Sequence, residues 1–215
     1  MTQLAIDSSG KIASAAILED SRLVADITLN SNMQHSRMLM PAIDRLLALA
    51  DMDKGRLDFI AVSAGPGSFT GLRIGAAAAK GLAFGLGIKL IPIPTLDALA
   101  YNIPFGNAAA IMDARRGQVY AAIYKDGARQ SDYMACPIEE LLDITPADCT
   151  FTGDGLDVFA DMLLSRGFKL APLGHNLQRA VSVGALALTR VNQAVDPSGF
   201  ALSYIRASQA ERERG

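Results

Sequence analysis

The chain has 215 residues, a formal net charge of -2 at neutral pH and two cysteines. Half of its residues are hydrophobic and a fifth are charged, which excludes global disorder and leaves ample length for a buried core. The near-balanced charge argues against a broad nucleic-acid-binding surface, although it allows a local basic patch.

The ends of the chain and its cysteines indicate a cytoplasmic protein. Residues 1–7 lack the basic segment of a signal peptide, and no apolar run is long enough to span a bilayer, so we expect no membrane contact. Cys136 and Cys149 have no CxxC companion, which favours reduced thiols over a zinc site or a disulfide framework.

The first half of the chain shows a definite order of elements. Apolar periodicity predicts three strands, a helix, a strand, a helix, a strand and a helix that begins at Thr95. The seven elements before Thr95 are expected at residues 2–8, 12–19, 22–30, 34–49, 57–64, 70–84 and 88–91.

The second half repeats this order after a break at Pro104 and Gly106. Three strands, a helix, a strand and a helix are predicted, followed by an apolar helix over 180–193 and a charged, frayed tail. The six repeated elements are expected at residues 108–112, 118–124, 130–134, 138–144, 149–152 and 156–165.

This repeated order predicts the fold class. Each half reads strand-strand-strand-helix-strand-helix, which differs from the alternation of a dinucleotide-binding fold. It is the order of the ribonuclease H-like fold, which is duplicated in the actin-like (ASKHA) superfamily. We therefore expect an α/β protein with a subdomain over residues 1–104 and a smaller one over residues 105–215.

The sharpest local motif is the glycine-rich segment 65–75, which lies between a predicted strand and a predicted helix. Free N–H groups at a helix N-terminus could hold a phosphate, which is one interpretation. The segment matches neither a dinucleotide fingerprint nor a Walker loop. The other interpretation, which we favour on spacing alone, is a tight connection with close backbone packing.

Small residues form two rows on the helix that follows this loop. Gly71, Gly75 and Ala79 recur at every fourth position, and Ala77, Gly81 and Gly85 form a second row. Glycine inside a helix costs roughly 1 kcal/mol against alanine, so a close approach of another backbone is expected. That backbone could belong to the chain's own sheet or to another subunit.

The remaining chemical signals are weak. His35 and His175 lie far apart in the sequence, so a metal site is not expected, and neither a Ser/His/Asp set nor an HExxH motif is present. No catalytic residue and no cofactor are therefore predicted.

The chain resembles the TsaB (YeaZ) family through motifs spread over nearly its whole length. The most specific motif is the segment from Gly65 to Gly75. The others are Leu4–Ser9, His35-Ser36, Leu39-Met40-Pro41, Leu46-Leu47, Ala79–Ala83, Pro94–Ala100, Asp113–Tyr120, Gly153–Gly155 and Ser203–Arg206.

The resemblance implies a non-catalytic subunit in tRNA threonylcarbamoyladenosine synthesis. The family has a catalytic paralogue, TsaD, whose His-x-x-x-His metal motif corresponds here to the segment from Thr95 to Leu99, where both histidines are missing. The implied partners are this paralogue and the ATPase TsaE. A homodimer through the N-terminal half is also implied, and tRNA is expected to be contacted only indirectly or through the complex.

The resemblance also implies two groups of site residues. The expected partner-binding residues are Met33, His35, Met38, Leu72, Arg73, Gly75, Ala76 and Lys80. In the actin superfamily, an aspartate that ends the first strand commonly serves a metal–phosphate site. The candidates for nucleotide binding are accordingly Asp7, Ser8, Ser9, Asp113, Gly153, Asp154 and Gly155.

Two other functions compete with this interpretation. An actin-fold small-molecule kinase or ATPase would use Asp7, Ser8, Ser9 and the turn over residues 153–155, and would bind magnesium–ATP tightly by itself. A peptidase has little support, because the sequence offers neither a nucleophile–base pair nor a metal set.

Overall fold

The computed structural model describes residues 1–30 and 34–205, which form two compact units. Unit 1 comprises Met1–Ala98 and Gln178–Leu202, and unit 2 comprises Leu99–Leu177 with residues 203–205. The expected boundary at 104/105 lies close to the first division. All residues after 104 were expected in the second subdomain, but Gln178–Leu202 belong to unit 1. The charged tail expected at the end falls on residues 206–215, outside the described residues.

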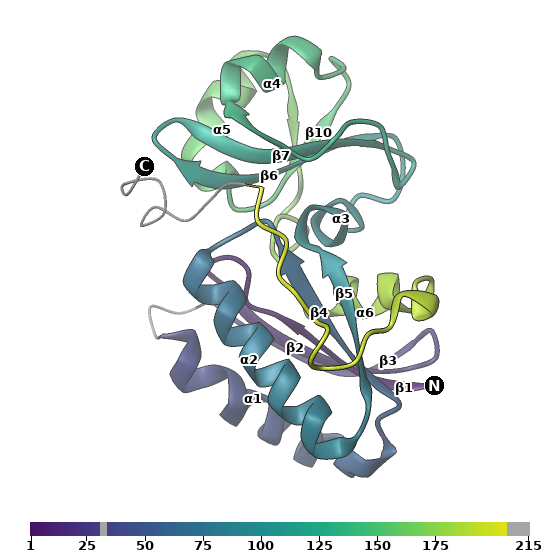
Figure 1. Cartoon of the computed structure of the whole chain (residues 1–215). Coiled ribbons are helices and arrows are strands. Elements are labelled where there is room, and N and C mark those ends of the chain that lie inside the picture. The colour runs from purple at the N-terminus through teal and green to yellow at the C-terminus, as the bar shows by residue number, and fades with distance from the viewer. Residues whose placement is uncertain (31–33, 206–215) are drawn as a thin grey trace, which may run out of the picture. The chain divides into compact units, whose positions relative to one another are not determined.

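Unit 1 is built on a mixed sheet of five strands in the order β3-β2-β1-β4-β5. Strand β1 pairs antiparallel with β2 and parallel with β4, and β4 pairs parallel with β5. Helices α1 and α2 cover one face and α6 covers the other (Figure 1). The bounds are β1 Thr2–Asp7, β2 Ala13–Glu19, β3 Arg22–Leu29, α1 His35–Leu49, η1 Lys54–Arg56, β4 Phe59–Gly65, α2 Phe69–Leu86, β5 Lys89–Pro94, α3 Thr95–Ala100, α6 Ala180–Leu188 and η2 Val191–Gln193.

The alternation of side chains along the strands creates two cores in unit 1. Leu4 and Ile6 point toward α1 and α2, whereas Ala5 between them points toward α6. The strands contribute the small side chains of Ala5, Ala16 and Ala61 to the α6 side, so this helix lies close to the sheet. A Cβ on Gly184 would come within 2.5 Å of Leu18 Cδ1 and 3.1 Å of Ala5 Cβ.

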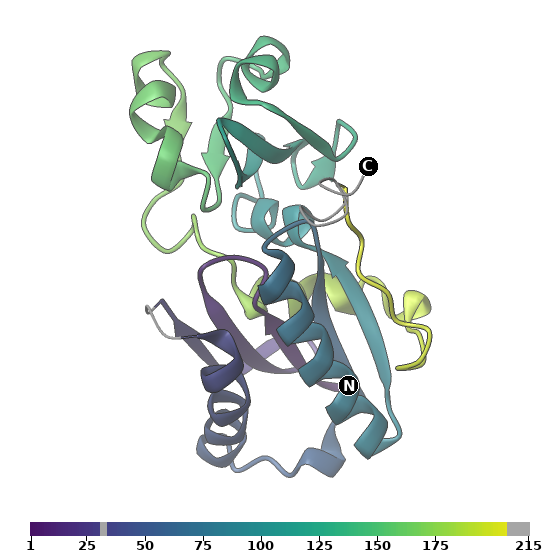
Figure 2. The ribbon, with the colours of Figure 1, turned by 60° about the vertical axis from the view of Figure 1, so that its left-hand side comes forward.

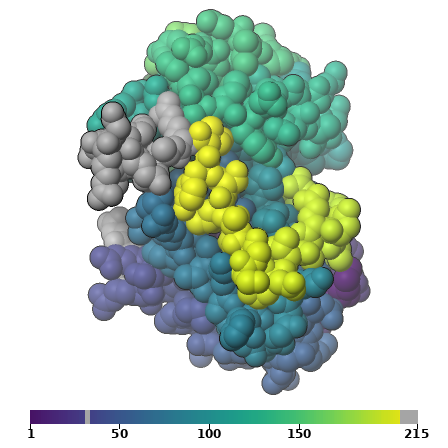
Figure 3. All heavy atoms as spheres, viewed as in Figure 1, coloured from purple at the N-terminus to yellow at the C-terminus, as the bar shows by residue number. Residues whose placement is uncertain are grey.

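The segment after α6 stays on unit 1 and protects an edge of its sheet. Val195 exchanges backbone hydrogen bonds of 2.8 and 2.9 Å with Leu90 of the edge strand β5. Farther along, Phe200 is buried in the core with α2, and its carbonyl accepts a hydrogen bond from Lys80 Nζ at 3.4 Å. Figure 3 shows this segment in yellow, running over the surface of unit 1. The packing of α6 and Phe200 explains why these residues group with the N-terminal strands.

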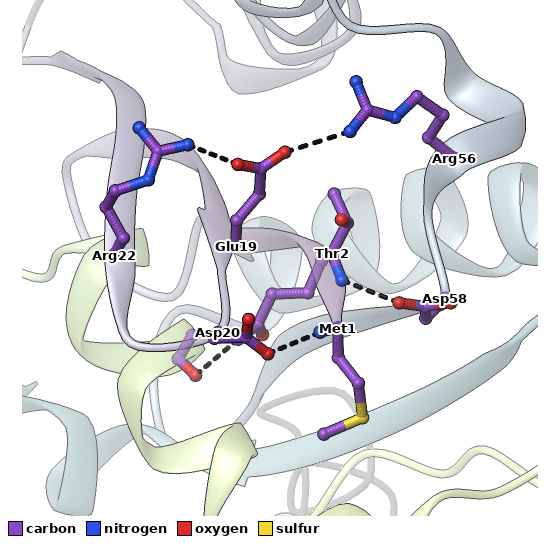
Figure 4. Close-up of polar contacts among 9 residues, drawn as sticks. Met1, Thr2, Glu19, Asp20, Arg22, Arg56 and Asp58 are labelled. Carbon is purple, nitrogen blue, oxygen red and sulfur yellow. Dashed lines mark hydrogen bonds and ion pairs between the residues drawn. The ribbon is translucent and has the colours of Figure 1, made fainter.

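Polar contacts fix the beginning of β1 (Figure 4). The amino group of Met1 lies 2.5 Å from Asp20 Oδ1, and Thr2 N donates to Asp58 Oδ2 at 2.7 Å. Glu19 bridges Arg22 and Arg56 from the same end of the sheet. These exposed pairs add little stability, but they align the first strand with its neighbours.

Unit 2 repeats the plan with a sheet in the order β11-β10-β6-β7-β8, and β9 also pairs with β7. Strands β6 and β7 are antiparallel, and β10 is parallel to β6 and β11. The bounds are β6 Asn107–Arg115, β7 Gln118–Lys125, β8 Ala128–Arg129, β9 Met134–Pro137, α4 Ile138–Ile144, β10 Thr150–Thr152, α5 Leu156–Ser165 and β11 Lys169–Leu170. The expected order of three strands, helix, strand and helix is confirmed in unit 1, and unit 2 follows it with two short strands, β8 and β9, in place of the third strand.

Two expected elements differ from the structure, and one short strand was not expected. In place of the strand expected at 130–134, the structure has two short strands, β8 and β9. Between them, Ser131 Oγ accepts a hydrogen bond from Ile123 N, at the point where a third strand would continue the ladder. The short strand β11 was not predicted. The helix expected over 180–193 ends at Leu188, and a separate 3₁₀ turn follows at Val191–Gln193.

The burial of Phe200 gives a test of the late segment. We expect Phe200→Ala to lower the free energy of unfolding by about 3 kcal/mol, because it empties a space beside α2. At this chain length that loss lowers the melting temperature by roughly 6–12 °C. Thermal unfolding followed by circular dichroism measures the shift, and Phe105→Ala, at an 83% exposed position, is the matched control. Equal melting temperatures for the two variants would contradict the packing.

Candidate functional site

The turn between β1 and β2 packs into the glycine loop of segment 65–75. Ser68 N donates to Ser9 O at 2.7 Å, and Ser8 Oγ donates to Gly71 O at 2.8 Å. Ser68 is the N-cap of α2, where its hydroxyl accepts from Gly71 N at 3.2 Å. The donors at this helix N-terminus are thus partly used by the chain itself. The interpretation as a tight connection with close packing is confirmed.

Gly71 and Gly75 of the first row on α2, together with Gly67 just before the helix, are required by this contact. A Cβ would lie 2.4 Å from Ser9 O at position 67, 2.1 Å from Ser8 O at position 71 and 2.4 Å from Ser8 Oγ at position 75. Real Cβ atoms essentially never approach so closely. The backbone that approaches Gly71 therefore belongs to the chain's own β1–β2 turn, and the Ser8 side chain of the same turn approaches Gly75.

Asp7 lies beneath this turn and is fully buried. Its Oδ1 accepts hydrogen bonds from Ser9 N at 2.8 Å and Ser9 Oγ at 2.6 Å, whereas Oδ2 has no hydrogen-bond partner among the described residues. Burial raises the pKa of Asp7, and interactions with Ser9 and, more weakly, with the side chain of Ser63 oppose this shift. A buried carboxylate oxygen without a partner suits a cation or a donor from a ligand, so nucleotide binding by Asp7, Ser8 and Ser9 stays a prediction.

His35 serves the same turn. Its Nε2 lies 2.9 Å from Gly10 O, so the first residue of α1 is tied to the β1–β2 turn. The charge of His35 also acts on Asp7, lowering its pKa as a smaller effect than burial. The ring of His35 thus contacts the chain's own backbone, and its expected role in binding a partner stays a prediction.

The other predicted partner-binding residues fall into three groups. Leu72, Gly75 and Ala76 are buried, so they lie on the side of α2 that faces the core and not on its outer surface. Met38 and Lys80 are half-buried, and Arg73 is exposed, with its guanidinium 3.7 Å from the ring centroid of Phe69. Met33 lies outside the described residues.

A different face of α2 is open. Ala77, Gly81, Phe84 and Gly85 are exposed, and Phe84 is 81% exposed. A Cβ at Gly81 or Gly85 would meet nothing within 4 Å, so the chain's own packing does not demand these glycines. We call these four residues together with Arg73 the outer α2 face. The second row of small residues in the sequence marks most of it, but Phe84 was missed.

The predicted site residues of unit 2 also come together. Asp113 N donates to Asp154 Oδ1 at 3.3 Å, and Gly155 N donates to Ile111 O at 3.2 Å, so the β10–α5 turn lies against the end of β6. Gly153 has a φ of 111°, and a Cβ there would lie 2.1 Å from Ile111 O. These glycines are required by close packing, and a nucleotide role for Asp113, Gly153, Asp154 and Gly155 remains a prediction.

The segment from Thr95 to Leu99 forms most of α3. Thr95 and Leu99 are fully buried, and Asp97 accepts a hydrogen bond from Arg190 Nη2 at 2.7 Å.

Among residues 1–30 and 34–205, no group of three or more His, Cys, Asp or Glu side chains could hold a metal ion. Burial raises the pKa of Cys149 to about 12, which keeps this thiol protonated. Within the described part of the chain, no helix is long and apolar enough to cross a membrane.

Comparison with known proteins identifies one family. The family model described as "TsaD: tRNA N6-adenosine threonylcarbamoyltransferase" matches residues 23–201. The tRNA threonylcarbamoyladenosine biosynthesis protein TsaB of Bacillus subtilis is 33% identical, and the alignment covers 98% of this chain and 96% of that protein. TsaB of Escherichia coli K12 is 34% identical over 58% of this chain and 55% of its own length, so that match spans just over half of either protein.

Solved structures confirm the fold class. YeaZ from Pseudomonas aeruginosa superposes with a TM-score of 0.79 at 26% identity, covering 95% of this chain and 99% of that one. A second Pseudomonas aeruginosa structure, described as similar to peptidase YeaZ, gives a TM-score of 0.82 with the same identity and coverage. Component A of (R)-2-hydroxyglutaryl-CoA dehydratase from Acidaminococcus fermentans, at 14% identity and a TM-score of 0.52, shares only the actin-like fold.

The turn contact predicts opposite effects for two glycines of the same helix. Gly71→Ala forces a methyl group against Ser8 O, and we expect it to lower the free energy of unfolding by at least about 2 kcal/mol. Gly81→Ala, in open space, should raise it by about 0.5–1 kcal/mol. Urea unfolding of the two variants measures both, and a stabilised Gly71→Ala protein would contradict the contact.

The burial of Asp7 predicts a pH dependence. The folded pKa is raised, so the folded state holds the proton more tightly than the unfolded state does. The contribution of Asp7 to stability is therefore most favourable below the unfolded pKa, is lost as pH rises toward the folded pKa, and stays constant above it. Asp7→Asn should remove this slope.

The measurement is the free energy of unfolding by urea for the wild type and Asp7→Asn at a series of pH values. We expect the wild type to lose stability relative to the variant as pH rises above the ordinary range of an aspartate. A relative gain of stability with rising pH would show that the carboxylate is stabilised in its ionised form by a partner.

Proposed function

The chain belongs to the TsaB (YeaZ) family, and from this premise we propose that it is a non-catalytic subunit in the synthesis of threonylcarbamoyladenosine in tRNA. In this proposal it binds a TsaD-like catalytic paralogue and acts together with a TsaE-like ATPase. Its place is the cytoplasm, where tRNA is modified.

The local structure of α3 supports a role other than catalysis. In the catalytic paralogue of this family, two metal-binding histidines occupy the positions that correspond to Thr95 and Leu99 of this chain. Both side chains are fully buried in this chain, and Asp97 between them is engaged by Arg190. A metal-dependent transfer has no ligands to use at this position.

The observation that carries the proposal is the outer α2 face. Gly81 and Gly85 weaken the helix without serving the packing of their own chain, and Phe84 exposes most of a large apolar ring. Close approach of a second helix would use the two glycines and bury Phe84. Figure 2 shows α1 beside α2 on the same side of the sheet. Leu49, the last residue of α1, is 66% exposed.

The proposed contact therefore differs from the residues expected from the sequence. Of the expected residues on α2, Arg73 is exposed and remains in the proposed contact. The buried residues Leu72, Gly75 and Ala76 lie beneath it. The exposed residues Ala77, Gly81 and Phe84 take their place at the surface. The same face would serve a homodimer when the catalytic paralogue is absent, since both partners would present related helices.

The deciding experiment is a threonylcarbamoyl-transfer assay on tRNA. The chain is tested alone, then with the catalytic paralogue and the ATPase of its host, and then the two partners are tested without it. We expect modification only when all three proteins are present. Modification by the isolated chain, or full activity without it, would overturn the proposal.

Pairing is tested by changing Phe84. We expect Phe84→Asp to weaken binding to the catalytic paralogue by at least about tenfold, because it places a charge in the centre of an apolar contact. Binding is measured by isothermal titration calorimetry. Leu164→Asp, at a 56% exposed position of unit 2, is the matched control and should bind like the wild type. Loss of binding in both variants, or in neither, would refute the assignment.

A second candidate is an ATPase of the actin fold, which the unpartnered Oδ2 of Asp7 favours. It predicts that the isolated chain binds magnesium–ATP and that Asp7→Asn abolishes this binding. Calorimetric titration with magnesium–ATP separates the two candidates. Tight binding with turnover would support the ATPase.

A further inference from the structure

The tip of the β6–β7 hairpin carries two arginines in an unusual backbone conformation. Arg115 pairs with Gln118, so Arg116 and Gly117 are the two central residues of the turn. Both have positive φ angles, 54° and 74°, as a type I′ hairpin turn requires. Arg115 also has a positive φ of 67°, where the register of the ladder shifts after Asp113.

A second hairpin of the same sheet shows what such a turn normally uses. Between β7 and β8, Lys125 pairs with Ala128, and the central residues are Asp126 and Gly127 with φ angles of 48° and 75°. Asp-Gly is a preferred sequence for this turn, because aspartate tolerates the left-handed region. Arginine is disfavoured there, since its Cβ is crowded by the following carbonyl and it has no short polar group to compensate. The β6–β7 turn therefore holds strain that its neighbour avoids, and such strain is typical of binding sites.

The contacts around the tip fix its backbone but leave the guanidinium groups of Arg115 and Arg116 exposed. Asp113 Oδ1 accepts from Arg115 N at 2.8 Å, and its Oδ2 lies 3.2 Å from Arg115 Nη1. The Arg115 side chain is nevertheless 80% exposed. Arg116 is exposed, and no ion pair joins it to any residue in the described ranges. Ile138 N donates to Gly117 O at 3.3 Å, which anchors the turn to the start of α4.

We propose that Arg115 and Arg116 bind the phosphodiester backbone of an RNA. Two adjacent guanidinium groups on a fixed turn present planar donors that match phosphate oxygens. The net charge of the chain is -2, and Glu139 and Glu140 follow the anchor point in α4, so the site suits one or two phosphates and not an extended track. The RNA is identified as tRNA only by resting on the proposed function.

The strain is tested by relieving it. Asparagine tolerates the left-handed region, so Arg115→Asn and Arg116→Asn should each raise the melting temperature by about 2–4 °C. Lys125→Gln, which removes an exposed cation at the other end of β7, should leave it unchanged. A lower melting temperature in both arginine variants would show that the arginines stabilise the turn and would overturn the inference.

Binding is tested with the isolated full chain and a tRNA transcript that reads a codon beginning with adenine. Fluorescence anisotropy at several salt concentrations gives the affinity and its salt dependence. For the double variant Arg115→Asn/Arg116→Asn we expect a loss of roughly two- to thirty-fold, and a salt slope smaller by roughly one for each arginine. Lys125→Gln should behave as the wild type.

Three outcomes would overturn the proposal. The first is that the wild-type chain fails to bind tRNA even at low salt. The second is that the double variant binds tRNA as tightly as the wild type. The third is that magnesium–ATP, and not tRNA, binds at the tip. If the double variant instead loses affinity for the catalytic paralogue but not for tRNA, the arginines recognise an acidic protein surface. None of these outcomes affects the three-protein transfer assay, so failure here is distinguishable from failure of the proposed function.

Discussion

The contact between the β1–β2 turn and the start of α2 is the constraint on which unit 1 depends. Ser8 O and Ser9 O occupy positions where any Cβ on Gly71 or Gly67 would overlap them. The hydrogen bonds from Ser68 N and to Gly71 O then fix the turn to the helix. Because the turn also ends β1 and covers Asp7, one small contact sets the position of α2 on the sheet.

This constraint separates the two sides of α2. The row of Gly71, Gly75 and Ala79 faces the chain's own core, so the residues about half a turn away must face outward. Ala77, Gly81 and Phe84 lie on this outward side. A glycine that no neighbour in its own chain requires weakens the helix for no internal gain, which is why the outer face, and not the glycine loop, carries the argument for a partner.

Much of the fold could be predicted because local periodicity follows burial. The apolar periodicity that predicts α1 comes from residues such as Leu39, Ile43 and Leu46, which are buried in one core of unit 1. The return of α6 to unit 1 could not be predicted in this way. That helix is apolar and follows strands of unit 2 in the chain, and only the small residues Ala5, Ala16 and Gly184 across the contact explain its place. Sequence order alone assigned it to the wrong half.

Which residues of α2 face a partner is harder to predict from the sequence, and helix geometry gives the reason. Leu72, Gly75 and Ala76 were expected at the partner contact because they lie on the helix rich in small residues, but a place on a helix does not say which way a residue points. A rotation of about 100° per residue places position 76 near the buried row and position 77 outside it. The positive φ of Arg116 had no signal in the sequence beyond an Arg-Gly turn, since a backbone conformation disfavoured for arginine is visible only in a structure. Motifs thus locate the important segments of this chain, whereas close contacts and backbone strain decide which of their residues are needed for folding and which remain available to a partner.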